Sequence, residues 1–310
     1  MNLSRQIEII RDFINNPRKQ YELLKRIDNW NMLCSALDTI GDTDLATDAY
    51  VAREATNNYG NGYLTAYGIL QVLFVQQDSI EYLHKALNIT YTQNATLKVI
   101  RDVRNDSVGH PIRTDRNKKP VAFNFITRIS LTGRGFSLIR TFPDRRDPQF
   151  TNVDMMELVN KQKQIHYSML SNILKTLREE DMNHKKKHAK EKLQNIFPPT
   201  LSYFIEKIIE AIHGGKPAAF GAIHTKMIGD YLDKFKGALT ARGIYEAYDT
   251  VKYEIELLEY PTGELRLYFE NINKSHINQK DAYIFAIFIK KRLEVLKDIA
   301  AEIDKEYSSI

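Results

Sequence analysis

The sequence predicts a mainly α protein with two short β-hairpins and a second helical region. Apolar residues recur at helical spacing over most of the 310 residues. Two segments instead alternate apolar and polar residues on either side of a glycine-containing turn, which is typical of hairpins. Hydrophobic residues make up 43% and charged residues 27%, an ordinary globular composition that argues against a largely disordered chain.

The first part of the chain is predicted to be a series of helices. A helical pattern of apolar residues begins at Leu3 and continues through Leu33. The strongest helix is expected over 63–87, and another over about 95–107. Gly109 then supplies a stop signal, because glycine readily adopts the left-handed angles that end helices.

A β-hairpin is expected after these helices, over 121–142. Apolar and polar residues alternate up to a glycine-containing turn at 132–135 and alternate again beyond it. One long helical pattern then runs over about 153–195. The proline pair at 198–199 ends this pattern and marks a domain boundary.

The second half of the chain repeats this mixture of elements. Helices are expected near 201–212 and over about 223–248, followed by a second hairpin at 253–269 and a C-terminal helix over about 279–307. We therefore expect three parts. They are a helical domain with a trailing hairpin at 1–150, a long helix and linker at 151–199, and a C-terminal helical domain with a hairpin at 200–310.

Composition also bears on compartment and partners. Cys34 is the single cysteine, so no disulfide forms within the chain, which fits a reducing compartment. No apolar run approaches the roughly 20 residues of a membrane span, and no secretory signal is evident at the N-terminus. We therefore expect a cytoplasmic protein without a membrane partner. The formal net charge of +5 permits a polyanionic partner.

Basic residues cluster in the middle of the chain. The candidates for contact with RNA phosphates are Arg101, Arg113, Arg116, Lys118 and Lys119. A second basic run lies at 185–192 and is expected to be a solvated helix face. The first cluster surrounds an arginine–histidine motif, which favours a functional role for it.

Arg104 and His110 stand six positions apart at the expected end of a helix. Arginine can stabilise phosphate oxygens through a planar fork of donors, and histidine can donate or accept a proton near neutral pH. Asn105 and Asp106 could orient the histidine or bind phosphate and sugar. The set is incomplete alone, because ribonucleolysis needs both an acid and a base. A symmetric dimer would bring two copies to one cleft.

Arg104, followed by Asn105 and then by His110 after five intervening residues, resembles the signature of HEPN domains. The resemblance covers about residues 1–115. It implies a helical bundle with the motif at a helix end, and a homodimer that cleaves RNA at a composite, metal-independent site. Arg104 and His110 would be the catalytic pair and Asn105 their polar companion. Toxin–antitoxin and antiviral defence systems are the settings that it implies, with an antitoxin or regulatory protein as a possible partner.

Other motifs favour structural roles. His184 and His188 share a helix face as metal ligands do, but the lysines between them would repel a cation, so no metal site is expected. Gln76, Gln77 and Asp78 interrupt an apolar helix and either line a polar cleft or form a buried network. The buried network is the favoured interpretation.

Two functions therefore remain open on sequence alone. The first is a metal-independent, cofactor-free endoribonuclease that leaves 2′,3′-cyclic phosphate ends. The alternative is a non-catalytic, HEPN-like adaptor that binds RNA or protein. The first requires His110 and the second does not.

Overall fold

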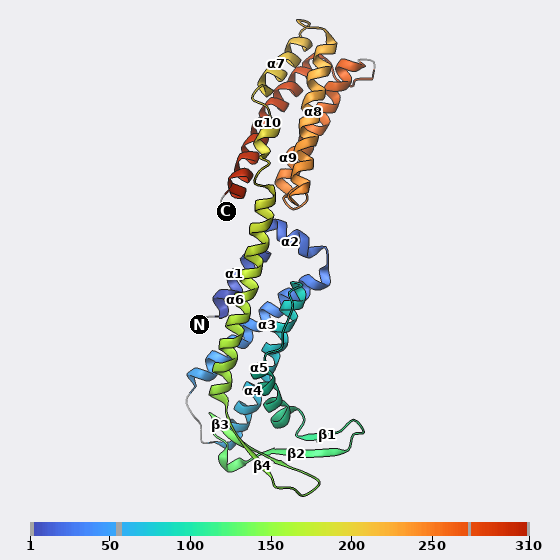
Figure 1. Ribbon diagram of the computed structural model, residues 1–310. Helices are drawn as coiled ribbons and strands as arrows, with labels where there is room; N and C mark the ends of the chain where they lie inside the picture. Colours follow the sequence, from blue (N-terminus) through green and yellow to red (C-terminus); the bar gives the residue numbers. More distant parts are fainter. Residues whose placement is uncertain (1–2, 54–57, 272–273, 309–310) are drawn as a thin grey trace. The chain divides into compact units, whose positions relative to one another are not determined.

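The structure is a computed structural model that describes residues 3–53, 58–271 and 274–308 (Figure 1). Contacts between residues divide the chain into two units. The first comprises Met1–Asn15 and Leu23–Leu177, and the second Asn16–Glu22 and Arg178–Ile310. The division falls within helix α6 (Met155–His188). The boundaries expected at 150 and 199 stay predictions about which segments fold independently.

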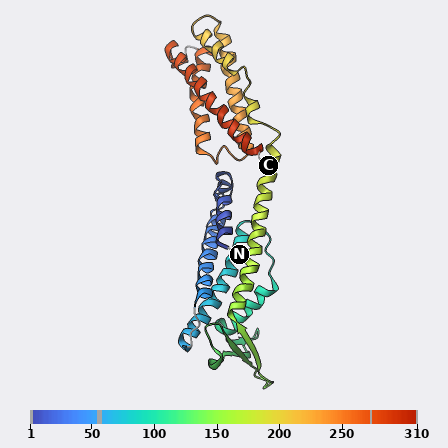
Figure 2. The same ribbon diagram turned by 90° about the vertical axis from the view of Figure 1, so that its left-hand side faces the viewer.

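The first unit is built on long helices. They are α1 (Leu3–Ile14), α3 (Ile27–Ala52), α4 (Tyr59–Ala86), α5 (Ala95–Arg104) and the N-terminal part of α6. Apolar faces of α1, α3, α4 and α6 share one core, which includes Leu3, Leu37, Leu83 and Leu170. The backbone of these helices can be followed in Figure 2. The amphipathic spacing in the sequence thus forms helices that bury one face each, as expected.

A buried polar network crosses this helical layer and confirms the expectation for Gln76 and Gln77. Gln77 Nε2 donates to Gln162 Oε1 over 2.7 Å, and Gln162 Nε2 donates to Gln76 Oε1 over 3.0 Å. His166 Nδ1 lies 3.1 Å from the same Gln76 oxygen. Burial lowers the pKa of His166 to about 3, and the nearby His84 adds to the shift. The histidine is therefore a neutral core residue.

The first unit ends in a four-stranded antiparallel sheet with strand order β1-β2-β3-β4. Its strands are β1 (Ile112–Thr114), β2 (Pro120–Ile126), β3 (Gly135–Thr141) and β4 (Gln149–Asp154). The pairing of β2 with β3 confirms the hairpin expected at 121–142. The two outer strands were not expected from the sequence. As a consequence α6 begins at Met155, after β4, rather than at 153.

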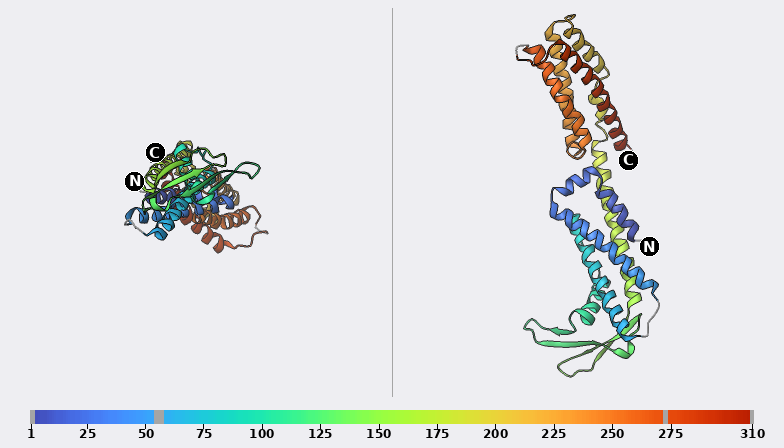
Figure 3. Two further views of the ribbon diagram at one scale, coloured as in Figure 1. Left: turned by 90° about the horizontal axis from the view of Figure 1, so that it is seen from below. Right: turned by 180° about the vertical axis from the view of Figure 1, so that it is seen from behind.

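The two faces of the sheet differ in environment. Ala122, Phe136 and Val153 are buried and belong to the inner face, and Phe136 and Leu138 share a core with α4 and α5. The helices of this unit lie on that side of the sheet (Figures 1 and 3). The alternate residues Phe123, Phe125 and Phe150 are exposed on the outer face.

The second unit is helical throughout its described residues. Its main helices are α7 (Leu201–Ile212), α8 (Ala218–Ala241), α9 (Asp249–Glu270) and α10 (Gln279–Ser308). Together with the 3₁₀ turn Leu193–Ile196 they enclose one core that includes Phe235, Leu258, Leu265 and Ile289. The long helices expected at the two ends of this half are confirmed.

The second hairpin, expected at 253–269, is wrong, because this segment is the single helix α9. Buried Val251, Ile255, Leu258, Leu265 and Phe269 follow helical spacing along it. That spacing coincides in part with strand alternation, which misled the sequence interpretation. Pro261 lies in the middle of this segment, and the helix accommodates it in its interior, although proline there removes one backbone hydrogen bond.

Within the described residues, no helix is both long and apolar enough to cross a membrane.

Candidate functional site

The candidate site lies where α5 ends. Asn94 caps the helix, since its side-chain oxygen accepts from the backbone N–H groups of Thr96 and Leu97 over 2.8 and 3.3 Å. After Arg104 the helix widens into one π turn, Asn105–Gly109. The turn closes where the His110 N–H donates to the Asn105 carbonyl over 2.6 Å. Because the turn is one residue wider than an α-helical turn, the backbone N–H of His110 lies next to the carbonyl of Asn105.

The Arg104 guanidinium is held by neutral amides. Its Nη2 donates to Gln71 Oε1 over 2.8 Å and its Nη1 to Asn105 Oδ1 over 3.0 Å. Its carbon lies 4.3 Å from the centre of the Phe74 ring, a cation–π contact. No carboxylate among the described residues pairs with Arg104. Its positive charge is therefore oriented but not neutralised.

Gly109 makes room for this guanidinium. A Cβ at position 109 would overlap Arg104 Nη1 and lie 3.2 Å from Arg104 Cζ. The arginine therefore folds back over the π turn and rests against the backbone of the residue next to His110. This close approach explains why a glycine precedes the histidine.

Arg101, one turn earlier on α5, has a different environment. Its carbon also lies over the Phe74 ring, at 4.4 Å. However, its Nη2 pairs with Asp78 Oδ1 at 2.6 Å and its Nε donates to Gln77 over 3.2 Å. Because Asp78 neutralises its charge, Arg101 fits a packing role better than the expected contact with RNA.

Asp106 connects the π turn to the sheet. Its buried carboxylate forms ion pairs with Arg113 of β1 and Arg140 of β3, and Asn124 Nδ2 of β2 lies 3.4 Å from it. Arg140 Nε in turn donates to Asn124 Oδ1 over 2.8 Å. The structure thus places Asp106 and Arg113 in one ion-pair network, in which the carboxylate is buried and Arg113 is partly exposed. That network links the sheet to the motif, and no described hydrogen bond joins it to the His110 ring.

His110 follows the π turn and is exposed. Its imidazole makes no hydrogen bond to any residue that the structure describes. The ring is consequently open to solvent and to a ligand, as a proton-transfer residue must be. Arg104, Asn105 and His110 are the sequence-predicted residues that the fold brings together.

The loop between β1 and β2 carries the other basic candidates. Arg116, Lys118 and Lys119 are exposed there. Asp115 shapes the loop, since its side chain accepts from the backbone N–H groups of Asn117 and Lys119 over 2.8 Å. These three cations remain available to a polyanion.

Sequence reasoning missed Gln71 and Phe74, which hold Arg104 in place. They stand three residues apart on α4, so they share one face of that helix. The spacing could have marked them as a pair. Their proximity to Arg104, however, depends on the packing of α4 against α5.

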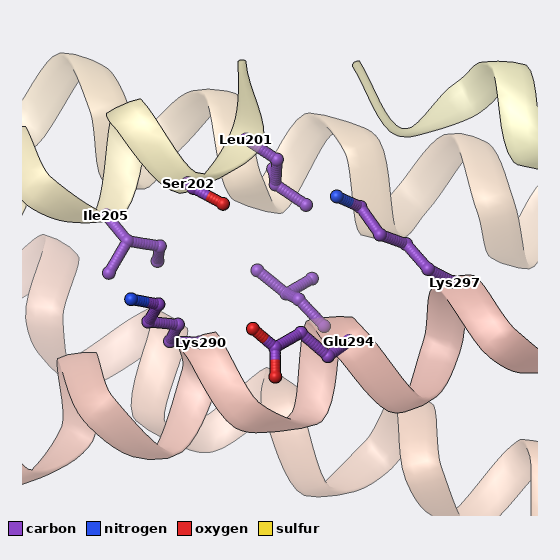
Figure 4. Close-up of a pocket in the computed structure, with 7 residues that line it drawn as sticks. Leu201, Ser202, Ile205, Lys290, Glu294 and Lys297 are labelled. Atoms are coloured by element: carbon purple, nitrogen blue, oxygen red, sulfur yellow. The ribbon is translucent and has the colours of Figure 1, made fainter. Parts of the chain in front are cut away.

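Elsewhere, the second unit has an apolar hollow of about 350 Å³ between α9 and α10, which Leu257, Tyr260, Phe285 and Phe288 help to line. A cavity of about 10 Å³ lies between α7 and α10, where Ser202, Lys290, Glu294 and Lys297 surround it (Figure 4). That volume holds about one water molecule. Among the described ranges, no group of three His, Cys, Asp or Glu side chains could hold a metal ion. His184, one of the two histidines that share a face of α6, forms a 3.0 Å hydrogen bond through Nε2 with the Tyr307 hydroxyl.

Comparison with known proteins found no matching protein-family model, no matching curated protein and no matching solved structure. The function is therefore argued from the site itself.

Proposed function

We propose that this protein is a metal-independent endoribonuclease of the HEPN type. The observation that carries the proposal is the Arg104 guanidinium, which is oriented by Gln71 and Asn105, carries no acidic partner among the described residues, and rests against Gly109, the residue before exposed His110. An oriented, uncompensated cation on the same turn that leads into an exposed imidazole suits a transition state that is anionic at phosphorus.

Each residue has a role in this reaction. His110 removes the proton from the ribose 2′-hydroxyl as that oxygen attacks the adjacent phosphorus. The P–O5′ bond then breaks, the leaving 5′-oxygen takes a proton from an acid, and a 2′,3′-cyclic phosphate results. Arg104 stabilises the non-bridging oxygens. Because one chain supplies one His110, the second proton-transfer group is the His110 of a second copy in a homodimer.

Cleavage of total cellular RNA in the presence of EDTA tests this proposal. We expect the wild-type protein to cut RNA and to leave 2′,3′-cyclic phosphate ends, and His110→Ala to lose about 10²–10⁴-fold of the rate. Products with 3′-hydroxyl ends, or loss of cleavage on adding EDTA, would contradict the mechanism.

A non-catalytic adaptor is the second candidate. It is favoured by the environment of His110, since no described carboxylate or other side chain orients its ring, whereas catalytic histidines are commonly oriented by a partner. The adaptor predicts RNA or protein binding that survives His110→Ala and no cleavage by the wild type.

The resemblance to HEPN domains also suggests a biological setting. A toxin or antiviral defence effector, acting in the cytoplasm and restrained by an antitoxin or regulatory protein, would need a nuclease of this kind. We expect expression of the wild type to arrest growth and expression of His110→Ala to be tolerated. Growth arrest by both proteins would show that toxicity does not depend on His110.

A further inference from the structure

The outer face of the sheet is unusually apolar for a surface. Phe150 is 69% exposed, Ile112 56%, Phe125 49%, Val121 42% and Phe123 36%. No helix among the described residues of the first unit lies over this side (Figures 1 and 3). Contiguous exposed apolar side chains of this kind commonly mark a binding surface.

Strand register arranges these residues in two rows. In the first row Phe125, Ile139 and Phe150 are direct partners across β2, β3 and β4. In the second row Ile112, Phe123 and Thr141 are direct partners across β1, β2 and β3. Directly opposed residues point to the same face, and the rows stand about 7 Å apart along the strands. Phenylalanine rings therefore recur across the outer face of the sheet, which forms an aromatic platform.

Positive charge is concentrated around this platform. Residues 111–154 contain nine arginines and lysines and four aspartates. Two of these arginines, Arg113 and Arg140, pair with buried Asp106 on the inner side, so the charge available at the outer face comes from the loops. The β1–β2 loop carries Arg116, Lys118 and Lys119. The β3–β4 loop carries Arg145 and Arg146, and Arg146 lies over the Phe142 ring at 3.7 Å.

We propose that the outer face of the sheet binds single-stranded RNA, with bases stacked on Phe123, Phe125 and Phe150 and phosphates held by the basic loops. Every base has a π face that can stack on an aromatic ring, and a duplex hides those faces. The inference rests on the proposed function, for which it names the substrate class. β1 starts two residues after His110, a chain length of at most about 7 Å, so the platform adjoins the motif.

Charge selects RNA over a second copy as the occupant. Two copies of this face would place like-charged loops against each other, which opposes association. A polyanion with exposed aromatic bases satisfies both the cationic loops and the phenylalanine rows.

Binding of a short fluorescent single-stranded RNA to full-length protein tests the proposal. All proteins carry His110→Ala, so that no RNA is cut and the result does not depend on catalysis. We expect the double variant Phe125→Ala/Phe150→Ala to bind at least about tenfold more weakly. Phe125→Tyr/Phe150→Tyr should bind within about twofold of the parent, because tyrosine keeps the stacking face. Tyr253→Ala/Tyr260→Ala removes exposed rings of α9 and should change nothing.

Two further measurements sharpen the test. The same RNA annealed to its complement should bind much more weakly than the single strand. Replacing Arg116, Lys118 and Lys119 by glutamine should lower the slope of log affinity against log salt by about 2, since each phosphate contact to a single strand contributes about 0.7.

The proposal is overturned if the phenylalanine-to-alanine variant binds as tightly as its parent. It is also overturned if Phe125→Leu/Phe150→Leu binds like the parent, since apolar contact without stacking then suffices. Equal affinity for single strand and duplex would have the same consequence. The proposal is overturned as well if Phe125→Ala/Phe150→Ala sediments more slowly than its parent but binds RNA equally well. That result would assign the face to self-association. If these proteins bind RNA as expected but the wild type, with His110 intact, cuts none, the proposed nuclease is contradicted while the proposed binding surface is retained.

Discussion

Arg101 and Arg104 lie one turn apart on α5 and contact the same Phe74 ring, yet their acceptors give them different roles. Asp78 neutralises Arg101, whereas amide oxygens of Gln71 and Asn105 hold Arg104 without removing its charge. A guanidinium that retains its charge interacts more strongly with an incoming phosphate than one already paired. The identity of the acceptor therefore distinguishes Arg104, the arginine proposed to bind phosphate, from Arg101, whose charge is already paired.

A matched pair of lysine substitutions tests this distinction. We expect Arg104→Lys to lower the single-turnover cleavage rate about 100-fold, because lysine keeps the charge but loses the fork that Gln71 and Asn105 orient. Arg101→Lys changes the same residue type on the same helix and should cost less than about threefold in rate. Equal losses in both variants, or equal losses in melting temperature, would assign Arg104 to packing.

The buried His166 gives a pH dependence to folding. The folded-state pKa is lowered to about 3, so above pH 6.5 both folded and unfolded chains are neutral at this residue. Below about pH 6.5 the unfolded chain gains a proton that the folded chain does not, and the free energy of unfolding falls by about 1.4 kcal/mol per pH unit. The contribution of a neutral His166 is thus complete above its unfolded pKa and lost toward acid.

Denaturant unfolding at pH 7 and pH 5 measures this effect. We expect His166→Gln, which keeps an amide donor for Gln76, to lose less stability between the two pH values than the wild type. His276→Gln removes an exposed histidine and should retain the wild-type loss. An identical pH dependence in all three proteins would place the titrating group elsewhere.

Sequence reasoning reached the proposed catalytic pair, Arg104 and His110, but not the residues that hold Arg104 and Asp106 in place. Arg104 and His110 stand in one short segment, so their proximity follows from local geometry. Gln71 and Arg140, by contrast, approach the motif only through packing of α4 and β3. Asp106 was expected to orient the histidine or to bind phosphate and sugar. In a helical turn, however, adjacent residues point in different directions, and Asp106 points to the sheet.

At the scale of elements, alternation predicted the central hairpin and failed for α9. On β2 the alternation is strict, with Val121, Phe123 and Phe125 exposed and the residues between them buried. On α9 the buried residues recur every three or four positions, which short windows cannot distinguish from strand spacing. The outer strand β1 has three residues, too few for any periodic signal.

The π turn between α5 and β1 is the element that forms the site, and Gly109 permits its shape. We expect Gly109→Ala to displace the Arg104 guanidinium, since the added Cβ overlaps Nη1. The end of an arginine side chain moves readily, so stability should fall by no more than about 1 kcal/mol. The cleavage rate should fall at least about tenfold, because a misplaced cation stabilises the transition state poorly.

Gly68→Ala is the control for this substitution. It adds a Cβ to helix α4 where no described atom lies within 4 Å, and alanine favours helices over glycine. This variant should retain full cleavage and gain slightly in stability. A Gly109→Ala protein that cleaves at the wild-type rate would show that the position of Arg104 on the π turn is not required.

At the scale of the whole molecule, the number of proton-transfer groups argues for assembly. Ribonucleolysis without a metal needs both an acid and a base. In the part of the chain that the structure describes, His110 is the exposed histidine beside Arg104. A two-fold dimer that placed two motifs in one cleft would supply both groups.

Mixing wild-type and inactive chains tests whether the two His110 side chains act together. After subunit exchange with an equal amount of His110→Ala, a site that needs both histidines survives only in wild-type homodimers. Those are about one quarter of all dimers and about half of the original ones, so total activity should fall to about half. If each chain carried its own complete site, total activity would stay unchanged. If the site needs both histidines, a tenfold excess of His110→Ala should suppress activity about tenfold; if each chain has a complete site, it should not. An equal excess of an unrelated protein should have no effect in either case.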